Sequence, residues 1–73
     1  MFQDMLKDLP EPLKNEVVEL GLKFKQMWDT EGYSDYGYMY VAYSIAVDKG
    51  EMTQPQADCC IKYLEALHKS WEA

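Results

Sequence analysis

The 73-residue sequence contains no arginine. All seven basic residues are lysines, they face 13 acidic residues, and the formal net charge at pH 7 is -6. Arginine is the side chain best suited to bind phosphate through two parallel hydrogen bonds, and a nucleic-acid backbone repels a protein of negative net charge. The composition therefore argues against direct binding of nucleic acid. The same charge argues against binding to anionic membrane surfaces.

Histidine and cysteine are almost as scarce. The only histidine is His68, and the only cysteines are the neighbours Cys59 and Cys60. Adjacent cysteines do not form the framework of a secreted disulfide-rich domain, which favours a reducing, cytoplasmic environment. On a helix, His68 lies about 12 Å from Cys60, too far for a thiol–imidazole pair. These three residues also lack the ligand number and spacing of a zinc site.

Long apolar runs and glycine-rich loops are missing as well. No segment approaches the roughly 20 apolar residues of a membrane-spanning helix, and the first ten residues, with two aspartates, do not resemble a signal peptide. The four glycines are scattered, which argues against a phosphate-binding loop. Acidic residues 29–35 have the spacing of a calcium loop, but Ser34 and Tyr40 stand where it needs glycine and glutamate. We therefore expect no catalytic residue, no metal, no cofactor and no enzymatic activity.

Apolar residues recur at helical spacing along the chain. Residues 2–9 carry them at i, i+3, i+4 and i+7, which predicts a short first helix that ends at Pro10. A second helix is expected from about residue 12 to residue 30, with Gly32 as its left-handed C-terminal cap. Gly21 interrupts this helix and indicates either close packing or slack there.

The last two helices are marked by their boundary residues. The third is expected to begin near Ser34 or Asp35, both favourable N-cap residues, and to end at Gly50. The fourth has the clearest start, because Thr53 and Gln56 fit a capping box. A strand over the tyrosine-rich part of the chain is possible by propensity alone, but the flanking caps favour a helix.

The fourth helix is amphipathic. Its predicted apolar face consists of Ala57, Cys60, Ile61, Leu64, Leu67, His68 and Trp71. Its opposite face carries acid-before-base pairs at i, i+4, including Glu65 with Lys69. The whole pattern predicts an all-α fold, a compact bundle of three main helices plus a short N-terminal helix, in a single domain that spans residues 1–73.

Five of the six tyrosines lie between residues 33 and 43. On a helix, this segment divides into two stripes, one with Tyr36, Met39, Tyr40 and Tyr43 and another with Tyr38, Val41, Ala42 and Ile45. A helix that is apolar nearly all round is either central in its bundle or partly covered by another molecule. Tyrosine is common at interfaces because it offers a large contact area at low entropic cost.

We therefore expect a small acidic protein-binding module, a regulator, adaptor or inhibitor of the kind that phages encode, whose partner is another protein or a second copy. The predicted partner-binding residues are Tyr33, Asp35, Tyr36, Tyr38, Tyr40 and Tyr43. The sequence leaves open which stripe faces the partner.

Two alternatives remain. One is an acidic nucleic-acid mimic that blocks a basic groove on a nucleic-acid-binding protein. The other is a structural homodimer or an accessory subunit of a larger complex. The even distribution of charge weakens the mimicry hypothesis. Residues 1–31 carry 7 acids and 4 lysines, and residues 32–73 carry 6 acids and 3 lysines, so each part has a net charge of -3.

Overall fold

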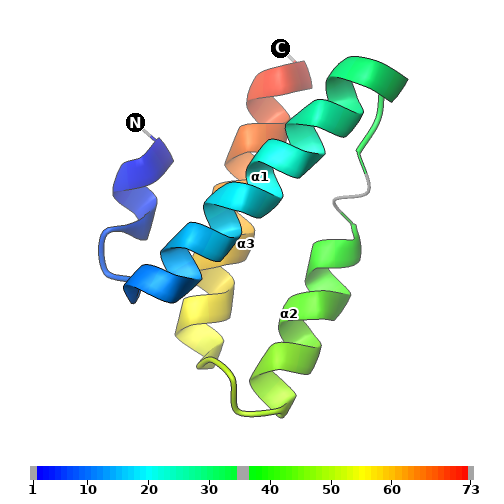
Figure 1. The fold of residues 1–73 in the computed structure, drawn as a ribbon. Coiled ribbons are helices and arrows are strands. Elements are labelled where there is room, and N and C mark those ends of the chain that lie inside the picture. Colours follow the sequence, from blue (N-terminus) through cyan, green and yellow to red (C-terminus); the bar gives the residue numbers. More distant parts are fainter. Residues whose placement is uncertain (1, 35–36, 73) are drawn as a thin grey trace.

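The fold is a bundle of helices joined by short connections (Figure 1). The computed structural model describes residues 2–34 and 37–72. It contains a 3-10 helix, η1 (Phe2–Leu6), followed by α1 (Glu11–Glu31), α2 (Tyr38–Asp48) and α3 (Gln54–Glu72). No strand occurs among these residues, so the predicted all-α class is confirmed. Within the same part of the chain, no helix has the length and apolar character that a membrane span requires.

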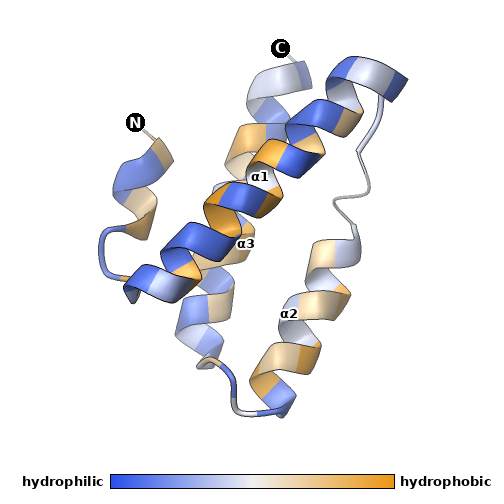
Figure 2. Ribbon diagram, viewed as in Figure 1, coloured by the Kyte–Doolittle hydropathy of each residue, from blue (hydrophilic) through white to orange (hydrophobic). Residues whose placement is uncertain are grey.

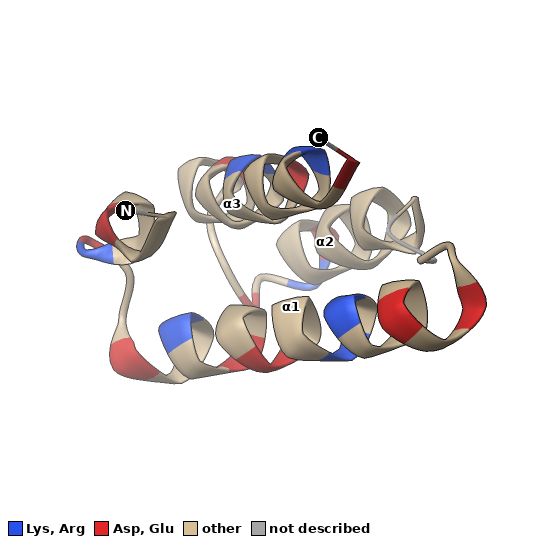
Figure 3. Ribbon diagram, turned by 90° about the horizontal axis from the view of Figure 1, so that it is seen from above, with Lys and Arg blue, Asp and Glu red and all other residues tan. Residues whose placement is uncertain are grey.

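The last helix, α3, is the element on which the others pack. η1, α1 and α2 each contact α3 closely, whereas α1 and α2 contact each other far less. Figures 1 and 3 show η1 and α2 on opposite sides of the α1–α3 pair. The central position that the tyrosine-rich helix could have taken therefore belongs to α3, and α2 lies at the side of the bundle.

The core draws residues from all four elements. Its buried hydrophobic members are Leu6, Leu9, Val17, Phe24, Met39, Tyr43, Ala57, Cys60, Tyr63 and Leu64. α3 supplies four of them, and His68 of the same helix is buried beside them. Tyr63 lies outside the apolar face predicted for this helix. It is buried because three elements cover α3, which widens the face that is shielded from water.

The N-terminal helix is tighter than the predicted one. It is a 3-10 helix of five residues, in which Leu6 is buried and Phe2 and Met5 are largely exposed. A 3-10 helix has three residues per turn, so positions i and i+4 do not share a face as they do in an α-helix. The thiol of Cys59 donates a hydrogen bond to the Met5 carbonyl at 2.8 Å and joins η1 to α3.

The predicted helix ends depend on local geometry and are found as expected. Gly32 has φ 76° and donates its N–H to the Trp28 carbonyl at 3.0 Å, which closes α1. Gly50, also at φ 76°, donates to the Val47 carbonyl, and the next N–H donates to the Ala46 carbonyl. This pair of bonds is a Schellman motif, which satisfies carbonyl groups that the end of α2 leaves without intrahelical partners.

The capping box at the start of α3 is also confirmed. The Gln56 side chain accepts from the Thr53 N–H at 2.9 Å, and the Thr53 hydroxyl accepts from the Gln56 N–H at 3.3 Å.

The start of α2 differs from the prediction. Ser34 is not helical, and the first helical residue is Tyr38, preceded by Gly37 at the N-cap; Asp35 lies outside the described residues. In Figure 1 the start of α2 lies well below the end of α1 on the same side of the bundle, and the connection has to span this separation. Extended backbone covers about 3.3 Å per residue against 1.5 Å in a helix, so this span favours a non-helical segment over the available caps.

Gly21 marks the close approach of α1 to α3. A Cβ atom at this position would lie 2.9 Å from Leu67 Cδ1 and 3.6 Å from Leu64 Cδ2. Of the two interpretations of Gly21, close packing and slack, the structure therefore supports close packing.

A larger side chain at Gly21 is expected to force the two helices apart. Gly21→Val should lower the free energy of unfolding by about 1–3 kcal/mol, the usual cost of overpacking a core. Gly21→Ala should change it by less than about 1 kcal/mol, because the gain in helix propensity offsets a small shift of the Leu67 side-chain tip. Urea denaturation followed by circular dichroism measures both values. Equal stability of Gly21→Val and the wild type would contradict the close approach.

Candidate functional site

The two long sides of α2 have opposite environments. Met39 and Tyr43 point into the core and are 0% and 9% exposed. Tyr38, Val41 and Ile45 lie on the other side and are 61%, 56% and 48% exposed. These three residues, at i, i+3 and i+7, form one stripe, which we call the outer face of α2. The structure thus answers which of the two predicted stripes is exposed.

Exposed hydrophobic side chains concentrate around this helix. Among the described residues, eight large hydrophobic side chains are exposed, and five of them lie between Tyr33 and Ile45. By contrast, Leu22 is the one such residue on α1, and an isolated exposed leucine is ordinary. Figure 2 shows α2 in hydrophobic or neutral colours along nearly its whole length, whereas α1 and α3 alternate with hydrophilic residues. The outer face therefore stands apart from the rest of the surface.

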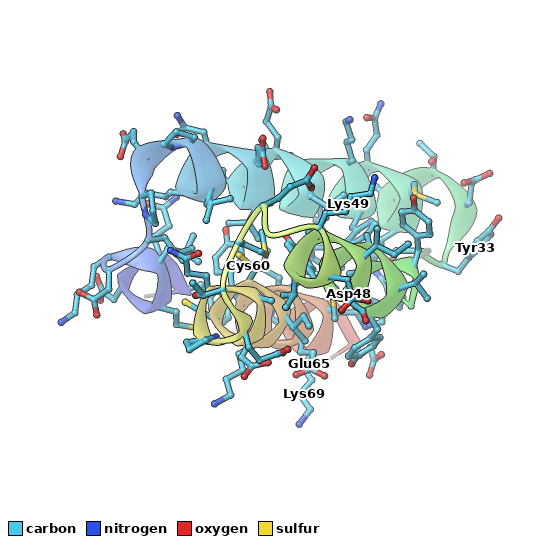
Figure 4. The ribbon with its side chains drawn as sticks, turned by 90° about the horizontal axis from the view of Figure 1, so that it is seen from below. Tyr33, Asp48, Lys49, Cys60, Glu65 and Lys69 are labelled. Atoms are coloured by element: carbon cyan, nitrogen blue, oxygen red, sulfur yellow. The ribbon has the colours of Figure 1, made fainter. Side chains whose placement is uncertain are left out.

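The predicted binding residues do not all lie on one surface. Tyr33 is exposed beyond the end of α1 and points away from the bundle (Figure 4). Tyr38 belongs to the outer face. Tyr43 is part of the core, because it lies one helical turn from Met39 on the side that packs against α3. Little of its surface is therefore exposed on α2, although it lines the groove described below. Asp35 and Tyr36 lie outside the described residues.

Tyr40 occupies the edge of α2 that faces α3. It is 43% exposed, although Met39 and Tyr43 of the same predicted stripe are buried. The Tyr40 hydroxyl donates a hydrogen bond to the carboxylate of Glu65, which Figure 4 shows projecting from α3. Glu65, expected to pair with Lys69, thus joins two helices instead. This contact explains why a half-exposed tyrosine holds a fixed position.

A groove separates α2 from α1 on the opposite edge. Its volume is about 540 Å³. The lining consists of Leu13, Glu16, Glu19, Leu20 and Lys23 from α1, Ala42, Tyr43 and Ala46 from α2, and Glu51 and Met52 from the turn that follows. Ala42 lies one turn after Tyr38, so the groove wall continues into the outer face. The groove exists because both helices pack on α3 and only slightly on each other.

Negative charge dominates the groove. Three carboxylates, those of Glu16, Glu19 and Glu51, line it together with a single lysine, Lys23. Lysines elsewhere on α1 form ion pairs within the helix, such as Lys25 with Asp29 at 3.0 Å. In the described part of the chain, none of the three groove carboxylates lies within ion-pair distance of a lysine. Their charge is therefore not neutralised locally.

Tyr43 lines the groove, and its side chain shares a hydrogen bond with the buried Cys60 thiol. Burial raises the pKa of Tyr43 well above its usual value, and the neighbouring Cys60 adds to the effect. Burial also raises the pKa of the Cys60 thiol, although the hydrogen bond with Tyr43 opposes this. A buried thiol with a raised pKa is a poor nucleophile at neutral pH.

His68 packs among other side chains, away from this thiol. Its ring packs edge-on against Trp28 with 5.1 Å between ring centroids, and its Nδ1 lies 3.0 Å from a Glu72 carboxylate oxygen. Trp71 lies beside both rings. His68 and Cys60 therefore belong to two separate clusters, as their spacing on the helix predicts. Neither cluster has the geometry of an activated nucleophile.

Within residues 2–34 and 37–72, no three His, Cys, Asp or Glu side chains come close enough to share a metal ion. Searches against protein-family models, curated proteins and solved structures find no match to this chain. Function therefore has to be inferred from the surface of the molecule itself.

Apart from Tyr43, the residues that line the groove are not among the binding residues predicted from the sequence. Leu20, Ala46 and Glu16 carry no local signal of a binding site, because the groove depends on how far α1 and α2 diverge. Val41 and Ile45 did carry a signal, since they share a stripe with Tyr38.

The buried hydroxyl of Tyr43 should make stability depend on alkaline pH. The unfolded chain loses the tyrosine proton above about pH 10, while the folded protein keeps it, so the free energy of unfolding falls as pH rises. One such proton contributes a slope of about 1.4 kcal/mol per pH unit. Averaged over about pH 9 to 11, where the unfolded tyrosine is only partly ionised, Tyr43→Phe should reduce the slope by about half this amount, measured by urea denaturation at each pH. Tyr38→Phe, which alters an exposed hydroxyl, is the control and should keep the wild-type slope. An unchanged slope in Tyr43→Phe would contradict the assignment.

Proposed function

We propose that this chain is a small protein-binding module, acting as a regulator, adaptor or inhibitor, and that its contact surface is the outer face of α2. The observation that carries the proposal is the exposure of Tyr38, Val41 and Ile45 together on one side of a helix whose other side forms the core. Soluble monomers rarely leave large contiguous apolar patches uncovered, and such patches typically mark binding sites.

The outer face has the composition that is typical of the centre of a protein–protein interface. Residues 38–47 contain no charged side chain, and Figure 3 shows α2 without either sign of charge over most of its length. The centres of protein interfaces are depleted of charge and enriched in aromatic residues, with polar groups at the rim. Tyr38 is the aromatic candidate for the centre. In this proposal Tyr40, which donates a hydrogen bond to Glu65, belongs to the rim.

A cytoplasmic location is part of the proposal. Cys59 and Cys60 are both free thiols, one partly and one fully buried, and no disulfide joins them. Free thiols inside a small domain are compatible with a reducing compartment.

Neutral polar residues on the outer face should abolish partner binding without unfolding the protein. Val41→Gln combined with Ile45→Gln should weaken binding at least tenfold, or about 1.4 kcal/mol, because two apolar contacts are lost. Leu22→Gln is the matched control, since it removes an equally exposed hydrophobic side chain from α1. The measurement is quantitative affinity capture from lysate with the three immobilised proteins, with thermal melts to confirm that each is folded.

The result distinguishes another protein from a second copy of the chain as the partner. Proteins retained by the wild type and by Leu22→Gln, but not by the double variant, are the expected outcome. Light scattering tests a second copy: a mass that rises above 8.5 kDa with concentration in the wild type and in Leu22→Gln, but not in the double variant, would identify self-association through the same face. Equal capture by all three proteins, with a constant mass of one chain, would refute the proposal.

A further inference from the structure

The α1–α2 groove points to the chemistry of the partner. We infer that the module binds a basic amphipathic helix, which lies along the groove with its apolar side on α2 and its lysines or arginines against the carboxylates of α1. This inference rests on the proposed function and specifies the partner.

The apolar part of the groove has the shape that a helix needs. Ala42 and Ala46 lie one helical turn apart on the groove side of α2, and both are only partly exposed. Small side chains at this spacing leave room for a second helix to approach closely. Leu20 of α1 and Met52 of the following turn complete the apolar lining. A helix that lies there can also reach Tyr38 and Ile45, because the groove wall and the outer face are adjacent sides of α2.

The charged part of the groove selects the sign of the partner. Glu16 and Glu19 lie at i, i+3 on the same edge of α1, and Glu51 lies beyond the far end of α2. With Lys23 as the one lysine in the lining, the groove carries a net charge of -2, from three acids and one base. The negative charge of Glu16 also acts on the Tyr43 and Cys60 side chains, which places its carboxylate near the groove floor. An anionic partner would be repelled here, whereas a row of lysines or arginines would be attracted.

A second copy of the chain does not supply that charge. Each copy carries a net charge of -6, and its apolar helix α2 contains no basic residue between Tyr38 and Val47. Two outer faces in contact would leave the carboxylates of both grooves uncompensated. A different protein with a basic amphipathic helix satisfies the apolar and the charged part of the groove together.

Model peptides test this inference directly. Three peptides of about 18 residues, or five helical turns, are titrated into the ¹⁵N-labelled protein and followed by NMR. The first has leucine and alanine on one face and lysine on the other, the second has glutamate in place of lysine, and the third is a scrambled form of the first. The basic amphipathic peptide should bind at least tenfold more tightly than the other two, with amide shifts concentrated at Leu20, Ala42 and Ala46. Equal binding of the scrambled peptide, or shifts on another face, would overturn the inference.

Charge-matched variants test the role of the acids. Glu16→Gln with Glu19→Gln removes two negative charges from the groove, and Asp8→Asn with Glu31→Gln removes two from elsewhere on the surface. The groove variant should weaken binding of the basic peptide at least fivefold, and the control variant less than twofold. Equal losses would reduce the effect to net charge and contradict a specific site.

These experiments distinguish a failure of the basic-helix inference from a failure of the proposed function. If no basic peptide binds but Val41→Gln with Ile45→Gln still abolishes partner capture, the amphipathic helix is the wrong occupant and the outer face remains the binding surface. If the mass instead doubles through the outer face, the occupant is a second copy and the inference is wrong. If the basic peptide binds in the groove while the double variant keeps its partners, the proposed function fails.

Discussion

The close packing of three elements on α3 is the constraint on which the rest of the structure depends. Gly21 lets α1 approach α3 closely, and η1 is joined to α3 through the hydrogen bond from Cys59. α2 also packs on α3, so little of its surface reaches α1. Among residues 2–34 and 37–72, no helix besides η1, α1 and α3 is present to cover the remaining side of α2. The exposed outer face and the groove beside it are consequences of this one arrangement.

Two tyrosine hydroxyl groups help to set how α2 is rotated. Tyr43 shares a hydrogen bond with Cys60 in the interior, and Tyr40 donates to Glu65 at the edge, so both hydroxyls contact α3. A buried hydroxyl without a partner is costly, which disfavours rotations that would separate Tyr43 from Cys60. With these two residues turned toward α3, Val41 and Ile45 necessarily face solvent. The surface that we propose for binding is therefore fixed by polar contacts on the opposite side of the helix.

The sequence predicts features whose causes are local. The Gly32 cap and the Thr53–Gln56 capping box need only a few neighbouring residues, and both are found as expected. The start of α2 was missed because the connection must first span the separation between the end of α1 and α2, which depends on how the helices pack. The exposed stripe was identified as one of two candidates, since periodicity shows which residues share a face and leaves open which face is covered.

The separation of apolar surface and charge has a consequence for how a partner would be recognised. Apolar contact with α2 is non-directional and supplies affinity, but the same face would accept many hydrophobic segments. The carboxylates on α1 run along only one side of the groove, so they distinguish a partner by the sign and position of its charges. An amphipathic helix that satisfies both sides is restricted in its rotation about its own axis, because its charged side has to face α1. Carboxylates concentrated on the α1 wall would thus make a general hydrophobic patch selective for a basic partner.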